Sequence, residues 1–559
     1  MSASLAVAAG LQFRPMDESD LAWIAAQDAE LYPFPWSEGN FADSISAGYA
    51  CWVMLDGAER VGYGVLMMVI DEAHKLRNAY RPSNVLGQSI KWALEDTRKL
   101  LLTATPLQNS LMELFGLCSI IDDYIFGDSR SYRQNYVNDD DIEGLKTRLR
   151  GFCKRTLRRQ VLAYIPFTNR KAITIRFAQA DKEYVLYRDV TDFLQEPESY
   201  AIPTSQRSLI TLVIRKILSS SSYALITTLE TIKKRLEQLR DKQPVQDNII
   251  DTLLDDEALD DEELEEIEAK SETDETQDKD KKIDLEKLKN EISRIDNFIE
   301  QAKAIKVDSK TSRLKEAIER GFSEAAKMNA RRKVIVFTES RRTQSYLKDY
   351  LDVNGYTGRA VIFNGTNTDP ESKKIYEQWF AANQNTGRIS GVQAADRRNA
   401  ILEHFRDHAE ILIATESAAE GINLQFCSLV INYDLPWNPQ RIEQRIGRCH
   451  RYGQEHDVVV INFLNERNDV DRRVYELLEY KFKLFDGVFG ASDEVLGSLE
   501  SGVDFEKEVL KIYQECRKPA EIMSAFVALQ KKMDEEIQNR LKETREILIE
   551  HLTVTSMNA

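Results

Sequence analysis

From Lys333 onward, strands and helices alternate along the chain, and this rhythm constrains the fold more than any other feature. The runs "KVIVFTES", "RAVIFNG", "EILIATES", "CSLVINYD" and "DVVVINFL" each predict a buried strand, and helical segments separate the first three. Strands that alternate with helices form a parallel sheet covered by helices on both faces. We therefore expect an α/β fold, with functional side chains beyond the carboxyl ends of its strands.

The centre of the chain combines two helices with a long acidic run. Residues 247–276 contain 15 acidic residues and one lysine, which is −14 of the total net charge of −17. The acidic balance therefore says little about the folded parts. Apolar residues at alternating steps of four and three predict one stripe on each flanking helix, and we expect a helical arm with a disordered acidic tip. The stripe residues are Leu225, Leu229, Ile232, Leu236 and Leu239, then Leu285, Leu288, Ile292, Ile295 and Ile299.

Bulk properties indicate several domains in a reducing compartment. The 559 residues exceed the ~250–300 at which a single core stops growing. The six cysteines are scattered, without a C-x-x-C pair or the histidines of a zinc site, so we expect reduced thiols. No apolar run reaches the ~18 residues of a membrane span, and the start lacks the basic flank of a signal peptide. These properties favour a cytoplasmic protein with no membrane partner.

The stretch "VLMMVIDEAHKLRN" is an apolar run that ends in two carboxylates, Asp71 and Glu72. A carboxylate at the end of a buried strand can hold the Mg²⁺ of a nucleotide, and its neighbour can orient the attacking water. Alone, "DEAH" fits an ordinary acidic turn equally well. About thirty residues later, "LLLTATPLQN" ends another strand with the hydroxyls of Thr103 and Thr105, which strengthens the nucleotide interpretation.

Two polar segments follow strands in the second half. "ATESAAEGINLQ" carries Glu420 and Gly421 just after a predicted strand. "QRIEQRIGRCHRYGQ" spaces four arginines by four, three and three residues, which predicts one helical face. A solvated basic face is one interpretation. Arginines that face phosphate groups are the preferred one, because guanidinium groups stabilise charge on a transferring phosphoryl group. The four are Arg441, Arg445, Arg448 and Arg451.

In chain order, "DEAH", "TATPLQN", "KVIVFTES", "ATESAAEGINLQ" and "QRIGRCHRYGQ" resemble motifs II to VI of superfamily-two helicase-like ATPases. "LTATPLQN" and the ending "HRYGQ" are similar to the Swi/Snf branch, in particular its bacterial RapA-like members. Five motifs in order make the resemblance specific. It covers the chain from about Val69 to the C-terminal helices. It implies two RecA-like lobes that bind ATP in the cleft between them and move along a duplex nucleic acid.

The resemblance also implies a role for each matched residue. Asp71 would bind Mg²⁺, Glu72 would activate water, and Arg448 and Arg451 would act as catalytic arginine fingers. A further set would bind the cofactor and link it to nucleic acid and lobe movement. That set comprises Thr103, Thr105, Glu420, Gly421, Asn423, Gln444 and Arg445.

One essential part of such a site is absent from the sequence. The phosphate-binding loop G-x-x-x-x-G-K-[ST] lies upstream of "DEAH" in this family, and its amides and lysine hold the phosphates. No Gly-Lys dipeptide occurs anywhere in the chain. We therefore expect ATPase activity to be impaired. We also expect the remaining first lobe to expose an unpaired sheet edge.

The space before "DEAH" resembles a different family. "YPFPWSEGNFADSISAGYACWVM" and "VGYGVLMMV" are similar to the first half of a GNAT acetyltransferase of the ribosomal-protein alanine kind. The later [QR]-x-x-G-x-[GA] loop that binds acetyl-CoA pyrophosphate in that family is missing. Two truncated motif sets thus meet near "IDEAH", which suggests a recombination or assembly join. Genomic DNA read across this position in an independent isolate would test it.

These readings divide the chain into five segments. They are an acetyltransferase-like fragment (1–69), the C-terminal half of an ATP-binding lobe (70–201), a helical arm (202–310), a second helicase lobe (311–486) and a C-terminal helical extension (487–559). The leading interpretation is a Swi/Snf-type translocase that uses ATP and Mg²⁺ on double-stranded DNA. RNA polymerase or another DNA-bound protein is a further expected partner, and the nucleoid of a bacterial cytoplasm the expected location. A non-catalytic binding remnant and an N-acetyltransferase are the alternatives.

Overall fold

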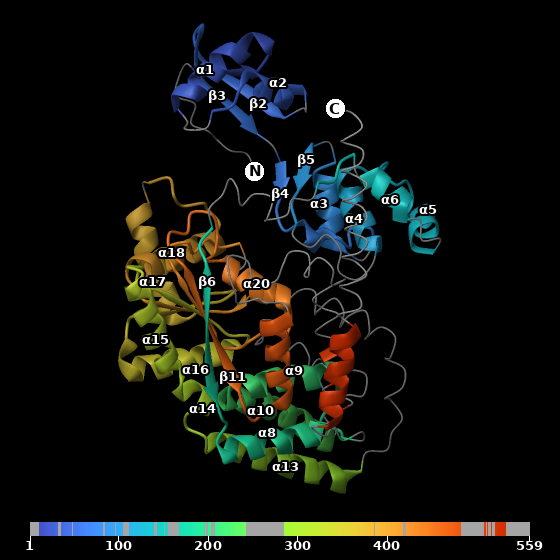
Figure 1. Cartoon of the computed structure of the whole chain (residues 1–559), viewed down its shortest axis with the longest axis vertical. Coiled ribbons are helices and arrows are strands. Elements are labelled where there is room, and N and C mark those ends of the chain that lie inside the picture. The colour runs from blue at the N-terminus through green and yellow to red at the C-terminus, as the bar shows by residue number, and fades with distance from the viewer. Residues whose placement is uncertain are drawn as a thin grey trace. The chain divides into compact units, whose positions relative to one another are not determined.

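A computed structural model describes most of the chain between residues 11 and 532. It divides into two compact units, Met1–Arg155 and Thr156–Ala559, which are described separately (Figure 1). The described residues are 11–31, 35–46, 49–66, 68–81, 84–95, 97–103, 111–138, 142–149, 151–154, 167–194, 196, 199–202, 207–241, 284–384, 386–416, 421–481, 508–509, 511–512, 516 and 520–532.

The first part of unit 1 is a three-stranded antiparallel sheet with two helices on one face. Strand β2 (Ala50–Asp56) lies between β1 (Leu11–Pro15) and β3 (Glu59–Leu66). Helices α1 (Leu21–Leu31) and α2 (Glu38–Ser46) pack on alternate residues of these strands. The likeness to an acetyltransferase stays a prediction.

The second part of unit 1 contains a small parallel sheet formed by β4 (Met68–Ile70) and β5 (Lys99–Leu101). Helix α3 (Val85–Ala93) connects the two strands, and α4 (Leu111–Ile121) follows β5. Parallel strands are normally buried on both faces. Here the side chains of Met68, Val69, Leu100 and Leu102 are all more than 40% exposed. The faces of this small sheet are therefore partly exposed, and the expected unpaired edge stays a prediction. Helices α5 (Ser129–Tyr132) and α6 (Ile142–Leu149) complete the described part of the unit.

Unit 2 contains a six-stranded sheet in the order β6-β11-β10-β7-β9-β8, in which every pair is parallel. The central strands are apolar and fully buried, as a parallel sheet covered on both faces requires. This confirms the predicted α/β fold. The strands are β6 (Arg170–Phe177), β7 (Val334–Phe337), β8 (Ala360–Phe363), β9 (Ile411–Ala414), β10 (Leu429–Asn432) and β11 (Val458–Asn465).

Helices cover both faces of this sheet (Figure 1). One face packs against α15 (Leu314–Lys327) and α16 (Arg341–Leu351). The other packs against four helices and against buried residues of the C-terminal segment, among them Val509 and Phe526. These four helices are α17 (Pro370–Asn383), α18 (Gln393–Asp407), α20 (Pro439–Gly447) and α21 (Asp469–Glu476).

The helical arm has its own apolar core. Helix α10 (Ser222–Arg240) packs on α9 (Arg207–Ser220) and α13 (Leu285–Lys303), and α13 packs on α8 (Asp181–Leu194). The predicted stripes are confirmed, because Leu229 and Ile295 are fully buried with most of their neighbours in the stripes. Leu285 is the exception: it begins α13 and is 49% exposed. The predicted acidic tip lies outside the described residues.

Strand β6 differs from its expected position. It lies within the segment 70–201 that the sequence assigned to the first lobe, yet it pairs with β11 over all eight residues, from Arg170 opposite Val458 to Phe177 opposite Asn465. The sheet of the second lobe therefore begins before the arm, and the arm is an insertion between two strands of one sheet. Short helix α14 (Ser309–Ser312) leads from the arm back to α15. No helix in the described part of the chain is long and apolar enough to cross a membrane.

Candidate nucleotide and nucleic-acid site

The "DEAH" residues follow β4, where the backbone turns sharply. Asp71 is exposed, and one of its carboxylate oxygens accepts a hydrogen bond from the Glu72 amide at 3.0 Å. Glu72 has φ +50°, a left-handed conformation that is uncommon for a residue with a side chain. The turn separates the two carboxyl groups from the strand that precedes them.

A buried histidine connects this turn to the end of the neighbouring strand. The Nδ1 atom of His74 lies 3.4 Å from a carboxylate oxygen of Glu72 and 3.2 Å from the hydroxyl of Thr103. The structure thus brings together two of the predicted site residues, one from each segment. The predicted Thr105 lies outside the described residues.

The geometry at Asp71 fits a magnesium ion better than it fits a complete nucleotide. Mg²⁺ keeps several waters and takes only one or two protein carboxylates beside phosphate oxygens, so an exposed carboxylate at a strand end suffices. No group of three metal-ligating side chains occurs among the described residues. The phosphates would lack the loop of backbone amides that is missing from the sequence. We therefore derive no hydrolytic step for this chain.

In unit 2, polar residues that were not among the predicted site residues follow the carboxyl ends of neighbouring strands. Thr338 and Glu339 follow β7, Glu416 lies just beyond β9, and Asp434 lies just beyond β10. These strands are adjacent in the sheet. The segments therefore meet at one sheet edge, as expected for parallel strands.

Arg445 joins three of these strand ends. Its Nη2 atom donates to Glu416 at 2.8 Å, its Nη1 atom donates to the carbonyl oxygen of Asp434 at 2.5 Å, and its guanidinium lies 5.2 Å from the ring centre of Phe337. Glu339 is 3.8 Å away. The side chain is only 1% exposed. Arg445 is thus directed into the lobe, and its role in cofactor binding stays a prediction.

The four arginines do not share one helical face, as the spacing had predicted. Helix α20 ends at Gly447, so Arg448 and Arg451 lie in the turns beyond it. Arg448 is buried, and its carbonyl oxygen accepts from the amide of Leu424 at 3.0 Å. Arg451 is partly buried and donates through Nε to the carbonyl oxygen of Gly447 at 2.8 Å. The helix therefore ends before the repeat is complete.

Of the segment "ATESAAEGINLQ", which precedes these arginines in the chain, the structure describes residues 414–416 and 421–425. Gly421 has φ +72° and is exposed, which suits a tight loop that only glycine adopts without strain. Asn423 is exposed, and its side-chain oxygen accepts from the amide of Gln425 at 3.1 Å. Gln444 is partly buried on α20, and Glu420 lies outside the described residues.

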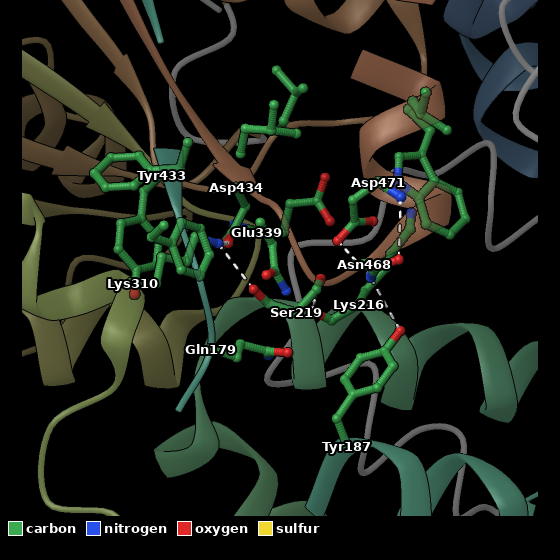
Figure 2. Close-up of a pocket in the computed structure, with 17 residues that line it drawn as sticks. Gln179, Tyr187, Lys216, Ser219, Lys310, Glu339, Tyr433, Asp434, Asn468 and Asp471 are labelled. Atoms are coloured by element: carbon green, nitrogen blue, oxygen red, sulfur yellow. Dashed lines mark hydrogen bonds and ion pairs between the residues drawn. The ribbon is translucent and has the colours of Figure 1, made fainter. Parts of the chain in front are cut away.

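A polar cavity of about 60 Å³ lies between the sheet edge and the arm (Figure 2). It has room for a few water molecules and is too small for a nucleotide. Lys310 donates to Asp434 at 2.6 Å and to the carbonyl oxygen of Ser219 at 2.9 Å. Figure 2 shows Asn468 joined to Tyr187 and to Asp471. The residues that line the cavity therefore connect the arm to the sheet.

The carboxyl groups at this cavity have opposite pKa shifts. Burial alone would raise the pKa of Asp434, but the charge of Lys310 and hydrogen bonds from Lys310, Thr338 and Ser220 outweigh it and lower the pKa. Burial raises the pKa of Glu339. Burial also raises the pKa of Asp471 to about 6, with only a weak opposing effect of Lys310. Sequence patterns signalled none of the contacts of Asp434, since its partners Lys310, Ser220 and Thr338 are 96 or more positions away in the chain.

Two protein families match the chain. The SNF2-related domain matches residues 58–222, and the helicase conserved C-terminal domain matches residues 309–453. Together with the relatives below, these matches support a helicase-like ATPase of the SNF2 type.

Individual relatives agree on this class. The ATP-dependent helicase YqhH of Bacillus subtilis (strain 168) is 28% identical over 437 residues, which cover 78% of this chain and 61% of YqhH. The chromodomain-helicase-DNA-binding protein 3 homolog of Caenorhabditis elegans is 22% identical over 447 residues, which cover 79% of this chain and 19% of the relative. The chain thus spans less than two thirds of the length of either relative.

Two solved structures also align with the chain. The Hef helicase domain of Pyrococcus furiosus is 17% identical, with a TM-score of 0.33 and 73% coverage of each chain. The SWI2/SNF2 ATPase core of Sulfolobus solfataricus in complex with dsDNA is 16% identical, with a TM-score of 0.29 and coverage of 80% of this chain and 73% of that chain.

Proposed function

We propose that this chain is a SNF2-type, helicase-like module that binds double-stranded DNA and hydrolyses ATP slowly or not at all. The observation that carries the proposal is the meeting of the second-lobe segments at one sheet edge, within a region that matches the helicase C-terminal domain. In this proposal Asp71 holds Mg²⁺, Glu72 orients water, and Arg448 and Arg451 face phosphate groups. The remaining predicted residues connect these groups.

The impaired hydrolysis follows from the missing phosphate loop. Removal of a single preorganised donor from a catalytic site typically costs ~3 kcal/mol or more. Loss of the lysine and the amides together removes several such donors. The carboxylates of the "DEAH" turn would then contact a metal ion and a nucleotide. No other part of the described first lobe would hold these two groups in place.

The first test compares ATP hydrolysis by the whole chain with hydrolysis by Glu72→Gln and Arg448→Ala variants, each with and without duplex DNA. We expect all three rates to equal the uncatalysed rate, because the phosphates lack their cradle. Circular dichroism of each variant checks that it is folded. DNA-stimulated hydrolysis that both substitutions abolish would overturn the proposed impairment.

The second test measures duplex DNA affinity as a function of salt. Each phosphate contact contributes about −0.9 to the slope of log K against log salt concentration. If the phosphate group that Arg451 meets belongs to DNA and not to the nucleotide, Arg451→Ala reduces the slope by about one contact. Arg406→Ala is the matched control, because Arg406 is an exposed arginine of the same unit paired with Asp407. An unchanged slope in Arg451→Ala, or equal losses in both variants, would contradict the assignment.

Two other functions have specific support and tests of their own. A non-catalytic remnant predicts DNA binding without any ATPase activity, and it shares the second test. An N-acetyltransferase rests on the likeness of residues 1–69 and predicts heat on titration with acetyl-CoA. RNA polymerase as a partner rests on the sequence resemblance alone, so duplex DNA is the partner we test first.

A further inference from the structure

A fully buried arginine outside the family motifs lies beside the arginine-bearing turns. Arg170 begins β6, and its side chain is 0% exposed. Its Nη1 and Nη2 atoms donate to the two carboxylate oxygens of Glu443 at 2.7 and 2.8 Å. Its Nε atom donates to Nδ1 of His450 at 3.1 Å. The guanidinium therefore contacts both α20 and the turn that follows it.

The contact with Arg170 fixes the tautomer of His450. Arginine cannot accept a hydrogen bond, so Nδ1 of the imidazole is the acceptor and carries no hydrogen. The hydrogen of the neutral ring is then on Nε2, which donates to the carbonyl oxygen of Thr168 at 2.7 Å. His450 is only 3% exposed. Both ring nitrogens are thus used by the segment that leads into β6.

These contacts enclose the turns that carry the two proposed phosphate-facing arginines. Glu443 precedes Arg448 by five residues, and His450 lies between Arg448 and Arg451. The segment before β6 is also tied to the start of β11, because the amide of Asn169 donates to Asp457 at 2.8 Å. A bidentate, buried arginine has a narrow range of orientations. It therefore restrains the turn from both sides.

We propose that Arg170 is a positioning residue, which holds residues 443–451 in the orientation that lets Arg448 and Arg451 meet phosphate groups. The effect of Arg170 on DNA binding rests on the proposed function. The restraint that Arg170 places on His450 and the turn is independent of the proposed function. Arg170 lies about 270 residues upstream of these turns, which places it outside any motif that local sequence defines.

The test compares Arg170→Lys and the double variant Arg170→Met/Glu443→Gln with Arg176→Ala. A lysine still pairs with Glu443 but cannot reach Nδ1 of His450 at the same time, and the double variant removes both buried charges together. Arg176 is the matched control, since it lies on the same strand with its side chain 58% exposed and only a 3.9 Å contact to Glu466.

The first measurement is nitrogen NMR of the chain labelled with ¹⁵N-histidine at about pH 8, where free imidazoles are neutral. The His450 signals are assigned by their loss in His450→Gln. We expect the Nε2–H tautomer in every variant, because Nε2 also donates to the carbonyl oxygen of Thr168. The Nδ1 resonance should move downfield, towards that of a nitrogen that accepts no hydrogen bond, in both Arg170 variants and stay in place in Arg176→Ala, because only Arg170 donates to Nδ1 in the contacts described above. An Nδ1 resonance that is unchanged in Arg170→Lys would refute the restraint.

The second measurement is hydrogen exchange of residues 444–451 together with binding of a fluorescein-labelled DNA duplex. We expect exchange in this segment to quicken by about tenfold or more in Arg170→Lys while β10 stays protected. DNA affinity should fall severalfold in the same variant, compared with the unaltered chain at the same salt concentration. If the NMR and exchange results hold but the unaltered chain binds no duplex, the proposed function fails and the positioning role stands. Unchanged exchange in Arg170→Lys would overturn the positioning role itself.

Discussion

In unit 2, buried charged side chains form hydrogen bonds and ion pairs that bridge the segments beyond neighbouring strands. Arg445 is enclosed by Glu416, the carbonyl of Asp434 and the ring of Phe337. Such pairs seldom add net stability, because desolvation offsets their attraction, but removal of one partner leaves an unpaired buried charge. Their effect is to fix relative orientation. The segments beyond β9 and β10 therefore keep one arrangement around α20.

The raised pKa of Asp471 makes a pH-dependent contribution to stability. The folded value of about 6 lies above the ordinary 3.8, so the folded chain holds this proton more tightly than the unfolded chain. Below about pH 4 the buried carboxyl group does not lower the free energy of unfolding. As the pH rises from about 4 to about 6, the group lowers the free energy of unfolding progressively, and above about pH 6 the loss stays at its full value of up to about 3 kcal/mol.

Asp471→Asn should therefore stabilise the chain at about pH 8 and have little effect at about pH 4. Asparagine keeps an oxygen that accepts from Asn468, so the hydrogen bond survives. Urea unfolding at the two pH values measures the difference. Asp349→Asn, at an exposed position on α16, is the control and should show no such dependence. A gain that is equal at both pH values would contradict the assigned cause.

At the level of elements, one glycine sets the distance between a helix and the "DEAH" segment. Gly116 is buried within α4, and a β-carbon there would overlap the backbone carbonyl oxygen of Arg77. The obstacle is backbone, so it cannot rotate away. The helix lies this close to the segment after β4 because the residue at 116 has no side chain.

Gly116→Ala should therefore destabilise unit 1 by about 1–3 kcal/mol or more, despite the higher helix propensity of alanine. Thermal unfolding followed by circular dichroism measures the loss. Gly64→Ala is the control, since a β-carbon at Gly64 on β3 meets no atom within 4 Å. Equal effects of the two substitutions would show that the close approach does not matter.

The sequence patterns predicted helices and strands well where the formation of an element depends on residues close to it in the chain. The strand and helix rhythm after Lys333 and the arm stripes through Leu229 and Ile295 all appear in the fold. Helix α20 ended earlier than the arginine spacing suggested, at Gly447. The partners of Arg170 were beyond prediction, since they lie 273 and 280 positions away. Those of Arg445 are nearer, at 29 and 11 positions, but they lie on other elements, and no helical or strand period encodes a contact between elements.

At the level of the whole molecule, the two units should unfold separately. Unit 1 has a small core and exposes several large apolar side chains, including Trp92 at 79%. Unit 2 contains the six-stranded sheet and the arm core. Small cores bury less of their surface and are less stable. Calorimetry of the whole chain should show two transitions, the first of them lowered by Gly116→Ala. A single transition that shifts as a whole would contradict this.

The position of β6 in the chain has a consequence for synthesis on the ribosome. Its pairing segment includes Asn169, which bonds to Asp457 across 288 residues. At ~5–20 residues per second, translation of that interval takes roughly 15–60 s. During this time β6 exists without the strand it will pair with, while the arm that follows it can already form its own core. The pairing of β6 with β11 is therefore the last strand pairing of this sheet to form, and a nascent chain interrupted within that interval retains an unpaired strand open to chaperones or to aggregation.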